Sequence, residues 1–293
     1  MPLVGLLAGK TAIITGGTTG IGRAICLEYL RQGANVVVNH LGLDKDSHHL
    51  DSLLSEAEAL SQPPPPPPSA SSSQVPDAGR SSGADAQAVG RLAHQAGDVR
   101  DPSTAARLVA AAVDLSPARR LDICVSNAGI CTFADLLTLS HDLFEATART
   151  NLDGAFYLTQ AAARQMALHQ SPPGGSIIGV SSVSALVGGG QQAHYTPTKA
   201  GVLSLMQSSA VALGRHGIRC NALLPGTIRT QLNEEDLADD AKRNYMEKRI
   251  PLGRTGAPAD VAGPAVFLAC DELSGYVTGA QLLVDGGLFV NLQ

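Results

Sequence analysis

The chain alternates between short apolar runs and longer segments with helical periodicity. The apolar runs are rich in β-branched residues and end at Gly, Pro, Asn or Asp, which is typical of strands buried on both faces of a sheet. Seven such strands are expected at Thr11–Thr15, Asn35–Asn39, Arg91–Ala96 (the weakest pattern), Leu121–Ser126, Ser176–Ser181, Ile218–Leu224 and Gln281–Val284. The clearest helical patterns between them cover Ile21–Gln32, Thr104–Leu115, Leu143–Leu168, His194–Arg215 and Pro258–Ala269.

This alternation predicts an α/β fold with a single doubly wound parallel sheet, a Rossmann fold, and helices on both faces. We expect residues 1–293 to form one domain. Ser61–Gly90 does not fit the pattern, because it holds six consecutive Pro followed by Ser, Ala and Gly. Such a segment buries too little apolar surface to offset its ordering entropy, so we predict a disordered insertion. A proline-rich ligand for an SH3-like partner is the alternative interpretation.

Composition excludes several classes of protein. A net charge of −5 without a basic stripe argues against nucleic acid as a partner, and the lack of a twenty-residue apolar run argues against a membrane. The five Cys are scattered and form no metal-type pair, so we expect reduced thiols and no metal site. The first ten residues contain too short an apolar stretch for a signal peptide, and we expect a cytoplasmic protein.

A glycine-rich loop follows the first predicted strand and opens the first predicted helix. Its sequence from Thr15 to Gly22 is TGGTTGIG. Gly16 allows the tight turn, Gly20 lets the backbone approach a pyrophosphate, and Gly22 lets helix and strand pack closely. The spacing is one residue longer than the usual dinucleotide fingerprint, but its place in the first strand-to-helix turn predicts a dinucleotide site.

In such folds, the side chains at the end of the second strand determine whether the site prefers NAD or NADP. An acid there binds the ribose of NAD, and an Arg nearby accommodates the 2′-phosphate of NADP. Here the residues are Asn39 and His40, and Thr19 in the loop is also uncharged. Asn39 can accept a ribose hydroxyl without repelling a phosphate, so we expect NAD, with NADP possible. His40 either contacts a 2′-phosphate or is only solvated.

Other turns at the carboxyl ends of strands belong to the same crevice. The Asp98 carboxylate can reach an adenine amino group, the small residues near Asn127 leave room for the cofactor, and the turn at Pro225 offers backbone groups to a nicotinamide carboxamide. The expected cofactor-binding residues are Gly16, Thr18, Thr19, Gly20, Ile21, Asn39, Asp98, Val99, Asn127, Ala128, Gly129, Tyr195, Lys199, Pro225, Gly226, Ile228 and Thr230.

Tyr195 and Lys199 are four residues apart in a helical pattern, which places both side chains on one face. An ammonium beside a phenol favours the phenolate and lowers the pKa of the Tyr. A Tyr tuned in this way takes a proton from an alcohol or gives one to a carbonyl.

These motifs, in order and spacing, resemble the short-chain dehydrogenase/reductase family over nearly the whole chain. The resemblance implies a catalytic tetrad of Asn151, Ser182, Tyr195 and Lys199. Tyr195 is then the general acid/base, and Lys199 lowers the pKa of Tyr195 and holds the nicotinamide ribose. Ser182 stabilises charge on the reacting oxygen, and Asn151 holds a water in the proton path. From the residues alone, Ser181 and Ser184 compete with Ser182.

Within the family, stretches such as HYTPTKAG (His194–Gly201) and QLLVDGGLFVNLQ (Gln281–Gln293) resemble fungal L-rhamnose 1-dehydrogenases. This implies hydride transfer from C1 of an aldose, above all L-rhamnose, to NAD(P)⁺, giving an aldonolactone. The alternatives are an NADPH-dependent ketone or 3-ketoacyl reductase and a non-catalytic dinucleotide-binding interaction module. We expect the sugar to meet Ser182, Ser184, Gln191 and Tyr195, with residues 226–250 as a helical lid. The family resemblance also implies a homotetramer.

Overall fold

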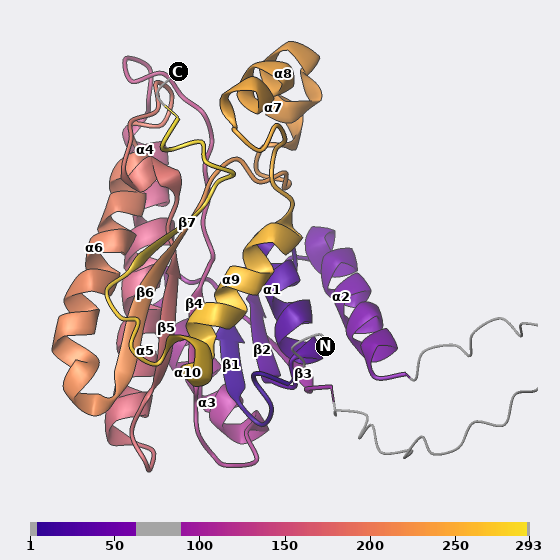
Figure 1. Cartoon of the computed structure of the whole chain (residues 1–293), viewed down its shortest axis with the longest axis vertical. Coiled ribbons are helices and arrows are strands. Elements are labelled where there is room, and N and C mark those ends of the chain that lie inside the picture. Colours follow the sequence, from indigo (N-terminus) through magenta and orange to yellow (C-terminus); the bar gives the residue numbers. More distant parts are fainter. Residues whose placement is uncertain (1–4, 63–88, 292–293) are drawn as a thin grey trace, which may run out of the picture.

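One parallel sheet of seven strands forms the centre of the computed structural model, which describes residues 5–62 and 89–291 (Figure 1). The strand order is β3-β2-β1-β4-β5-β6-β7. The strands are β1 (Thr11–Ile14), β2 (Asn35–His40), β3 (Leu92–Ala96), β4 (Ile123–Ser126), β5 (Gly175–Val180), β6 (Ile218–Pro225) and β7 (Gln281–Val284). The order reverses between β1 and β4, and this creates a switch point where ligands bind in such sheets.

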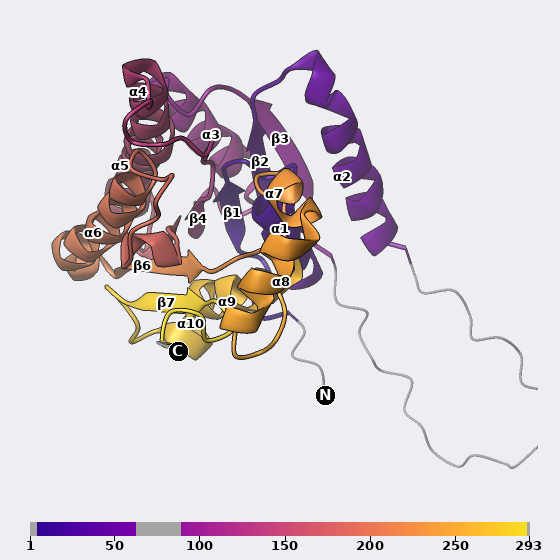
Figure 2. The ribbon, with the colours of Figure 1, turned by 90° about the horizontal axis from the view of Figure 1, so that it is seen from above.

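Helices cover both faces of the sheet, as the sequence predicted (Figure 2). One face packs against α1 (Gly20–Arg31), α2 (Ser47–Leu60) and α9 (Pro258–Ala269). The other face packs against α3 (Pro102–Leu115), α5 (Gly154–Leu168) and α6 (Thr196–Leu213). The strands are apolar on both faces because each face meets a helical layer.

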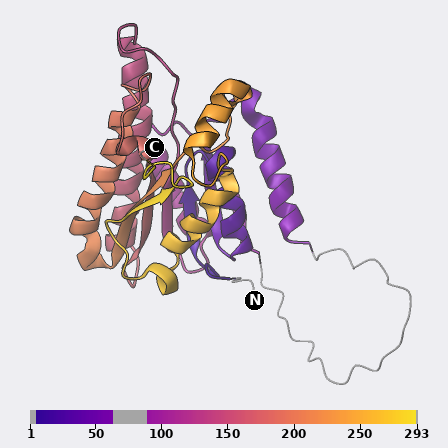
Figure 3. The same ribbon diagram turned by 45° about the horizontal axis from the view of Figure 1, so that its top comes forward.

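The remaining helices are short and lie near the carboxyl ends of the strands or beside α9. They are α4 (His141–Ala148), α7 (Glu234–Ala238), α8 (Asp240–Arg249) and α10 (Asp271–Ser274). The pair α7 and α8 stands beyond the carboxyl end of β6, above α1 and α9 (Figures 1 and 3). The C-terminal segment holds the end of α8, because the Asn291 side chain donates to the Arg249 carbonyl (2.9 Å). Within the segment 226–250, α7 and α8 are helical, whereas residues 226–233 are not; that the segment acts as a lid stays a prediction.

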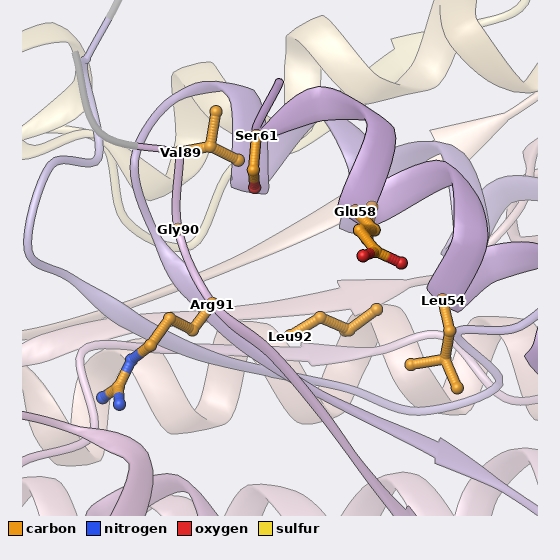
Figure 4. Close-up of a pocket in the computed structure, with 8 residues that line it drawn as sticks. Leu54, Glu58, Ser61, Val89, Gly90, Arg91 and Leu92 are labelled. Atoms are coloured by element: carbon orange, nitrogen blue, oxygen red, sulfur yellow. The ribbon is translucent and has the colours of Figure 1, made fainter. Parts of the chain in front are cut away.

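The predicted insertion, Ser61–Gly90, lies almost entirely outside the described residues. Where the described chain ends and resumes, a cavity of about 390 Å³ lies between the end of α2 and the start of β3 (Figure 4). Its lining residues include Leu54, Glu58 and Leu92. This cavity is at the amino end of β3, whereas the candidate catalytic residues follow the carboxyl ends of the strands. Among the described helices, none combines the length and apolarity needed to span a bilayer.

Candidate active site

The glycine-rich loop connects β1 to α1 with the geometry that its sequence predicts. Gly16 has a φ of +60°, in the region that favours glycine. A Cβ on Gly22 would lie 2.3 Å from the Gly16 carbonyl oxygen, so only glycine lets α1 begin this close to the loop. These two positions fix the loop against the start of the helix.

The start of α1 is open to an anion. Its capping residue, Thr19, makes no side-chain hydrogen bond to the helix, and the first turn carries no acid. The first backbone N–H groups and the positive end of the helix dipole are therefore available to a pyrophosphate, and the dinucleotide fits this site. Thr230 lies beside the same loop, because a Cβ on Gly20 would be 3.2 Å from its methyl group. The structure thus brings Thr230 and Gly20 together, as expected for one crevice.

Thr15 and Asn127 join the carboxyl ends of β1 and β4 across the switch point. The Thr15 hydroxyl accepts the backbone N–H groups of Asn127 (3.0 Å) and Ala128 (3.1 Å). The Asn127 amide donates to the carbonyls of Thr15 (2.9 Å) and Gly16 (3.1 Å). Asn127 therefore shapes the floor of the cofactor site through the loop. Sequence reasoning missed Thr15, whose only signal was its place as the last residue of a strand.

At the ribose end of the crevice, the side chains of Asn39 and Asp98, which were expected to bind the cofactor, already bond to other groups of the protein. The Asn39 side chain is 2% exposed, and its amide donates to the Gly97 carbonyl (2.8 Å). The Asp98 carboxylate accepts two hydrogen bonds from the Arg100 guanidinium, and this holds the pKa of Asp98 below its usual range. Both side chains thus have partners within the protein, and their contact with a cofactor stays a prediction. Val99 packs against the start of α5, where it meets Gly154.

Asn151 lies in a π-helical turn, Arg149–Asp153, that separates α4 from α5. The sequence predicted one continuous helix over Leu143–Leu168, so this interruption is a correction. The turn aims the buried Asn151 amide at the segment after β4. Its Oδ1 accepts the Ile130 N–H (2.8 Å), and its Nδ2 donates to the Ile130 carbonyl (3.0 Å) and the Thr198 hydroxyl (3.2 Å). Asn151 therefore joins this segment to α6, as π turns at functional sites often do.

The two adjacent serines after β5 have different partners. The Ser181 hydroxyl is buried and donates to the Lys199 carbonyl (2.7 Å), so it anchors α6. The Ser182 hydroxyl accepts the Ser184 N–H (3.1 Å) and interacts with the Tyr195 phenol. These contacts favour Ser182 over Ser181 as the partner of Tyr195, and the catalytic role of Ser182 stays a prediction.

Lys199 lies beneath Tyr195 and is almost completely buried. Its Nζ donates to the Val180 carbonyl (3.0 Å) and lies 5.5 Å from the centroid of the Tyr195 ring. A Cβ on Gly129 would lie 3.4 Å from this Nζ and 3.2 Å from the Asn151 Oδ1. The structure thus brings Gly129, Asn151, Tyr195 and Lys199 to one place, with Ser182 beside the phenol.

The electrostatics of the Tyr195–Lys199 pair differ from the expectation. Burial raises the pKa of Tyr195, and the Cys131 thiol raises it further, whereas the interaction with Ser182 lowers it. Burial also lowers the pKa of Lys199 to about 8. The predicted lowering of the Tyr195 pKa by Lys199 is therefore wrong for this structure. The ammonium bonds to a carbonyl rather than to the phenol, and desolvation penalises the phenolate more strongly.

Two of the expected substrate residues, Ser184 and Gln191, differ in burial and in their neighbours. Ser184 is half-buried beside Ser182, but Gln191 is exposed and donates to the Asp135 carboxylate (3.1 Å). Its neighbour Gln192 instead reaches the Cys131 thiol (3.6 Å), which acts on the pKa of Tyr195. Sequence reasoning missed Cys131 as a neighbour of the phenol, and no periodicity or motif could have revealed it.

The turn after β6 and His194, which precedes Tyr195, have the following contacts. Gly226 donates its N–H to the Val284 carbonyl (3.0 Å) just after Pro225, and Ile228 is buried against Gly256. His194 is fully buried, and neither ring nitrogen has a hydrogen-bond partner among the described residues.

Comparison with known proteins gives consistent matches over the whole chain. A family model described as short chain dehydrogenase matches residues 10–62, and one described as enoyl-(acyl carrier protein) reductase matches residues 73–289. The L-rhamnose-1-dehydrogenase of Scheffersomyces stipitis is 52% identical over 99% of this chain and 100% of its own length. The L-rhamnose 1-dehydrogenase (NAD(P)(+)) of a Sphingomonas strain is 50% identical over 98% and 99%.

The fold also matches solved structures. A protein from Sinorhizobium meliloti described as a short-chain alcohol dehydrogenase superposes with a TM-score of 0.81 at 29% identity, and the match covers 98% of both chains. The similarity therefore extends from sequence to the arrangement of strands and helices.

Proposed function

Because the chain belongs to the short-chain dehydrogenase/reductase family, we propose that it is an NAD(P)-dependent dehydrogenase that oxidises C1 of an aldose, L-rhamnose first, to the aldonolactone. The observation that carries this proposal is the cluster of Tyr195, Ser182 and Lys199 beside an anion-binding glycine loop. The sugar specificity is supported by relatives with the same named activity at 50–52% identity over nearly the full length.

The residues of the site fit a nicotinamide cofactor. The N–H groups at the start of α1 would hold the pyrophosphate, and the space that Gly129 leaves beside the buried Lys199 Nζ would hold the nicotinamide ribose. The oxidised cofactor would supply the hydride acceptor for C1 of the sugar. The remaining chemistry belongs to side chains of this protein.

Tyr195 takes the proton from the C1 hydroxyl as the hydride leaves, so that a C1–H and an O–H bond are converted into the lactone carbonyl. The Ser182 hydroxyl holds the reacting oxygen and stabilises the charge that develops on it. The same hydroxyl lowers the pKa of Tyr195, which favours the phenolate. The Tyr195 proton is then lost to solvent.

Lys199 and Asn151 assist the proton transfer to Tyr195. Lys199 supplies positive charge beneath the phenolate, and at pH 7 it is mostly charged because its pKa is about 8. Asn151 fixes both backbone groups of Ile130 and the Thr198 hydroxyl. We infer that Asn151 positions the segment carrying Cys131 in addition to holding a water in the proton path.

The remaining expectations extend this proposal. Ser184 and residues of the lid meet the sugar, with Gln192 nearer to the phenol than Gln191. The enzyme acts in the cytoplasm as a homotetramer. Support for assembly comes from large apolar side chains that remain exposed on the outer faces of α5 and α6, where Phe156 is 43% and Val211 is 88% exposed. Light scattering on the purified protein gives the number of subunits.

The test is NAD(P)H formation at 340 nm with L-rhamnose, compared with D-glucose and L-lyxose, with NAD⁺ and NADP⁺ in parallel. We expect turnover with L-rhamnose and its loss in Tyr195→Phe, while cofactor affinity is retained. The opposite reaction, NADPH oxidation with acetoacetyl-CoA, serves as the competing assay. Turnover of the thioester without turnover of any free sugar would overturn the sugar assignment and leave a ketoacyl reductase.

A further inference from the structure

His40 and His94 form a pair of imidazole rings on neighbouring strands. In the β2–β3 register, His94 is opposite Val38, so it points to the same face as His40, two residues further along. The Nε2 of His40 is 3.2 Å from the Nδ1 of His94, and the ring centroids are 5.3 Å apart. His40 is half-exposed and His94 is exposed, so solvent and ligands can reach the pair.

The pair is located where a dinucleotide places its adenosine ribose. His40 is the last residue of β2, twenty residues after Gly20, and the preceding carbonyl accepts the Gly17 N–H (3.1 Å). The side chain at this strand end is the one that distinguishes a ribose hydroxyl from a 2′-phosphate. Because the Asn39 amide is buried and bonded to the Gly97 carbonyl, His40 is the available side chain.

The hydrogen bonds around the rings assign the neutral state. The Gly42 N–H donates to the His40 Nδ1 (3.1 Å), so the proton of a neutral His40 is on Nε2 and is donated to the His94 Nδ1. A further proton on the pair must break one of these two bonds. Burial, together with His94, also lowers the pKa of His40. The hydrogen bonds and the lowered pKa of His40 therefore both favour the neutral state of the pair.

Two ion pairs lie on the elements around the histidine pair. The titratable and charged groups on the elements around it are Arg23, Asp44, Lys45, Asp46, His48, His49, Asp51, Glu56, Asp98 and Arg100. Arg23 is paired with Glu56 (2.9 Å), and Asp98 is paired with Arg100 (2.6 Å). No carboxylate or guanidinium occupies the strand end itself, so the charge there is set by the two imidazoles.

We propose that the His40–His94 pair selects between NAD and NADP according to pH: when neutral, its remaining N–H, on the His94 Nε2, donates to the adenosine ribose of NAD, and when protonated the pair binds the 2′-phosphate of NADP. The inference rests on the proposed nicotinamide cofactor but not on the sugar. A phosphate oxygen supplies the acceptor that compensates for the hydrogen bond lost on protonation. Binding of the phosphate is then linked to uptake of one proton, which changes the preference by up to about tenfold per pH unit.

The test uses the adenosine halves of the two cofactors, so it does not depend on turnover. Binding of 2′,5′-ADP and 5′-AMP is measured by calorimetry between pH 5.5 and 8, in buffers with different ionisation enthalpies. We expect the ratio of the 2′,5′-ADP affinity to the 5′-AMP affinity to rise at least about fivefold from pH 8 to pH 6. Proton uptake should accompany 2′,5′-ADP binding near pH 7.

Four variants separate the titration of the pair from that of the ligand, since the phosphate itself titrates near pH 6. His40→Gln and His94→Gln should flatten the ratio and abolish the proton uptake. His40→Arg should bind 2′,5′-ADP preferentially at every pH. His169→Gln, an exposed His just beyond the end of α5, should keep the wild-type profile.

A wild-type ratio that does not change with pH would overturn the proposal, as would a wild-type profile in His40→Gln. Failure of both nucleotides to bind the wild-type protein would overturn it together with the nucleotide site. The expected binding profile in a protein that oxidises no sugar would leave the role of the pair intact and refute only the substrate assignment.

Discussion

Replacing Lys199 with Met should abolish turnover and yet stabilise the folded protein at neutral pH. The Lys199 side chain is 5% exposed, and its ammonium has one hydrogen bond, to the Val180 carbonyl (3.0 Å). Burial lowers its pKa from 10.5 to about 8. The folded state therefore carries this charge at a cost in stability, which the proposed function explains by a need for a cation near the Tyr195 phenolate.

The fall from 10.5 to about 8 corresponds to about 3 kcal/mol of destabilisation by the charged form. Met fills a similar volume without a charge, but it leaves the Val180 carbonyl without its donor, at about 1–3 kcal/mol. The net effect of Lys199→Met is a stabilisation of about 0–2 kcal/mol at pH 7. Because the pKa is lowered on folding, the penalty is fully present below pH 8. It disappears as the pH rises from 8 towards 10.5, where the variant becomes the less stable protein.

The free energy of unfolding is measured in urea at pH 7, 8.5 and 10 and at one protein concentration. Far-ultraviolet circular dichroism is the probe, since the chain has no Trp. Lys248→Met, at an exposed position of α8, is the matched control and should show a difference from wild type that is constant with pH. Turnover of Lys199→Met should fall by at least about a hundredfold. A stability difference for Lys199→Met that is also constant with pH would refute the reasoning.

Three further changes test the framework of the site. Asn151→Ala removes three buried hydrogen bonds and should lower the free energy of unfolding by about 2–4 kcal/mol, visible as a lower melting temperature. Arg219→Met removes the guanidinium that donates to the buried Ala269 carbonyl and to the Asp271 carboxylate and should cost about 1–3 kcal/mol, whereas Arg119→Met, at an exposed ion pair, should change stability by less than about 0.5 kcal/mol. Gly22→Ala should weaken cofactor binding at least tenfold by calorimetry, because its Cβ would meet the Gly16 carbonyl oxygen at 2.3 Å, while Gly190→Ala, whose Cβ meets nothing within 4 Å, should not. The argument for Asn151 would be contradicted if Asn151→Ala and wild type had equal melting temperatures. The argument for Arg219 would be contradicted if the two Arg variants lost equal free energy of unfolding, and the argument for Gly22 if Gly22→Ala kept its cofactor affinity.

The strands and the glycine loop were predictable because their signals are local. A buried parallel strand is a short apolar run, and each predicted run contains an observed strand or differs from it by one residue at an end. Pro258–Ala269 and Gln281–Val284 were predicted with the observed bounds. The positions of Gly16 and Gly22 could also be inferred, since a turn with positive φ and a close approach each select for glycine.

The π turn at Arg149–Asp153 could not be predicted. The apolar periodicity continues through α4 and α5, and one inserted residue in a helical ladder leaves no compositional signal. Its consequence is functional, since it turns the Asn151 amide towards Ile130 and Thr198. The candidate residue was therefore named from the sequence, but the reason that it reaches the site depends on tertiary structure.

The electrostatic state of the catalytic pair could not be predicted either, because it depends on burial. Spacing placed Tyr195 and Lys199 together, and two opposite charges in water would favour each other. In the folded protein, burial raises the pKa of the phenol and lowers that of the ammonium, so both shifts oppose the charged pair. Ser182 is the group that acts in the other direction, since its hydroxyl lowers the pKa of Tyr195. In the proposed reaction Ser182 therefore has two roles, because the side chain that would stabilise the reacting oxygen also lowers the pKa of the base.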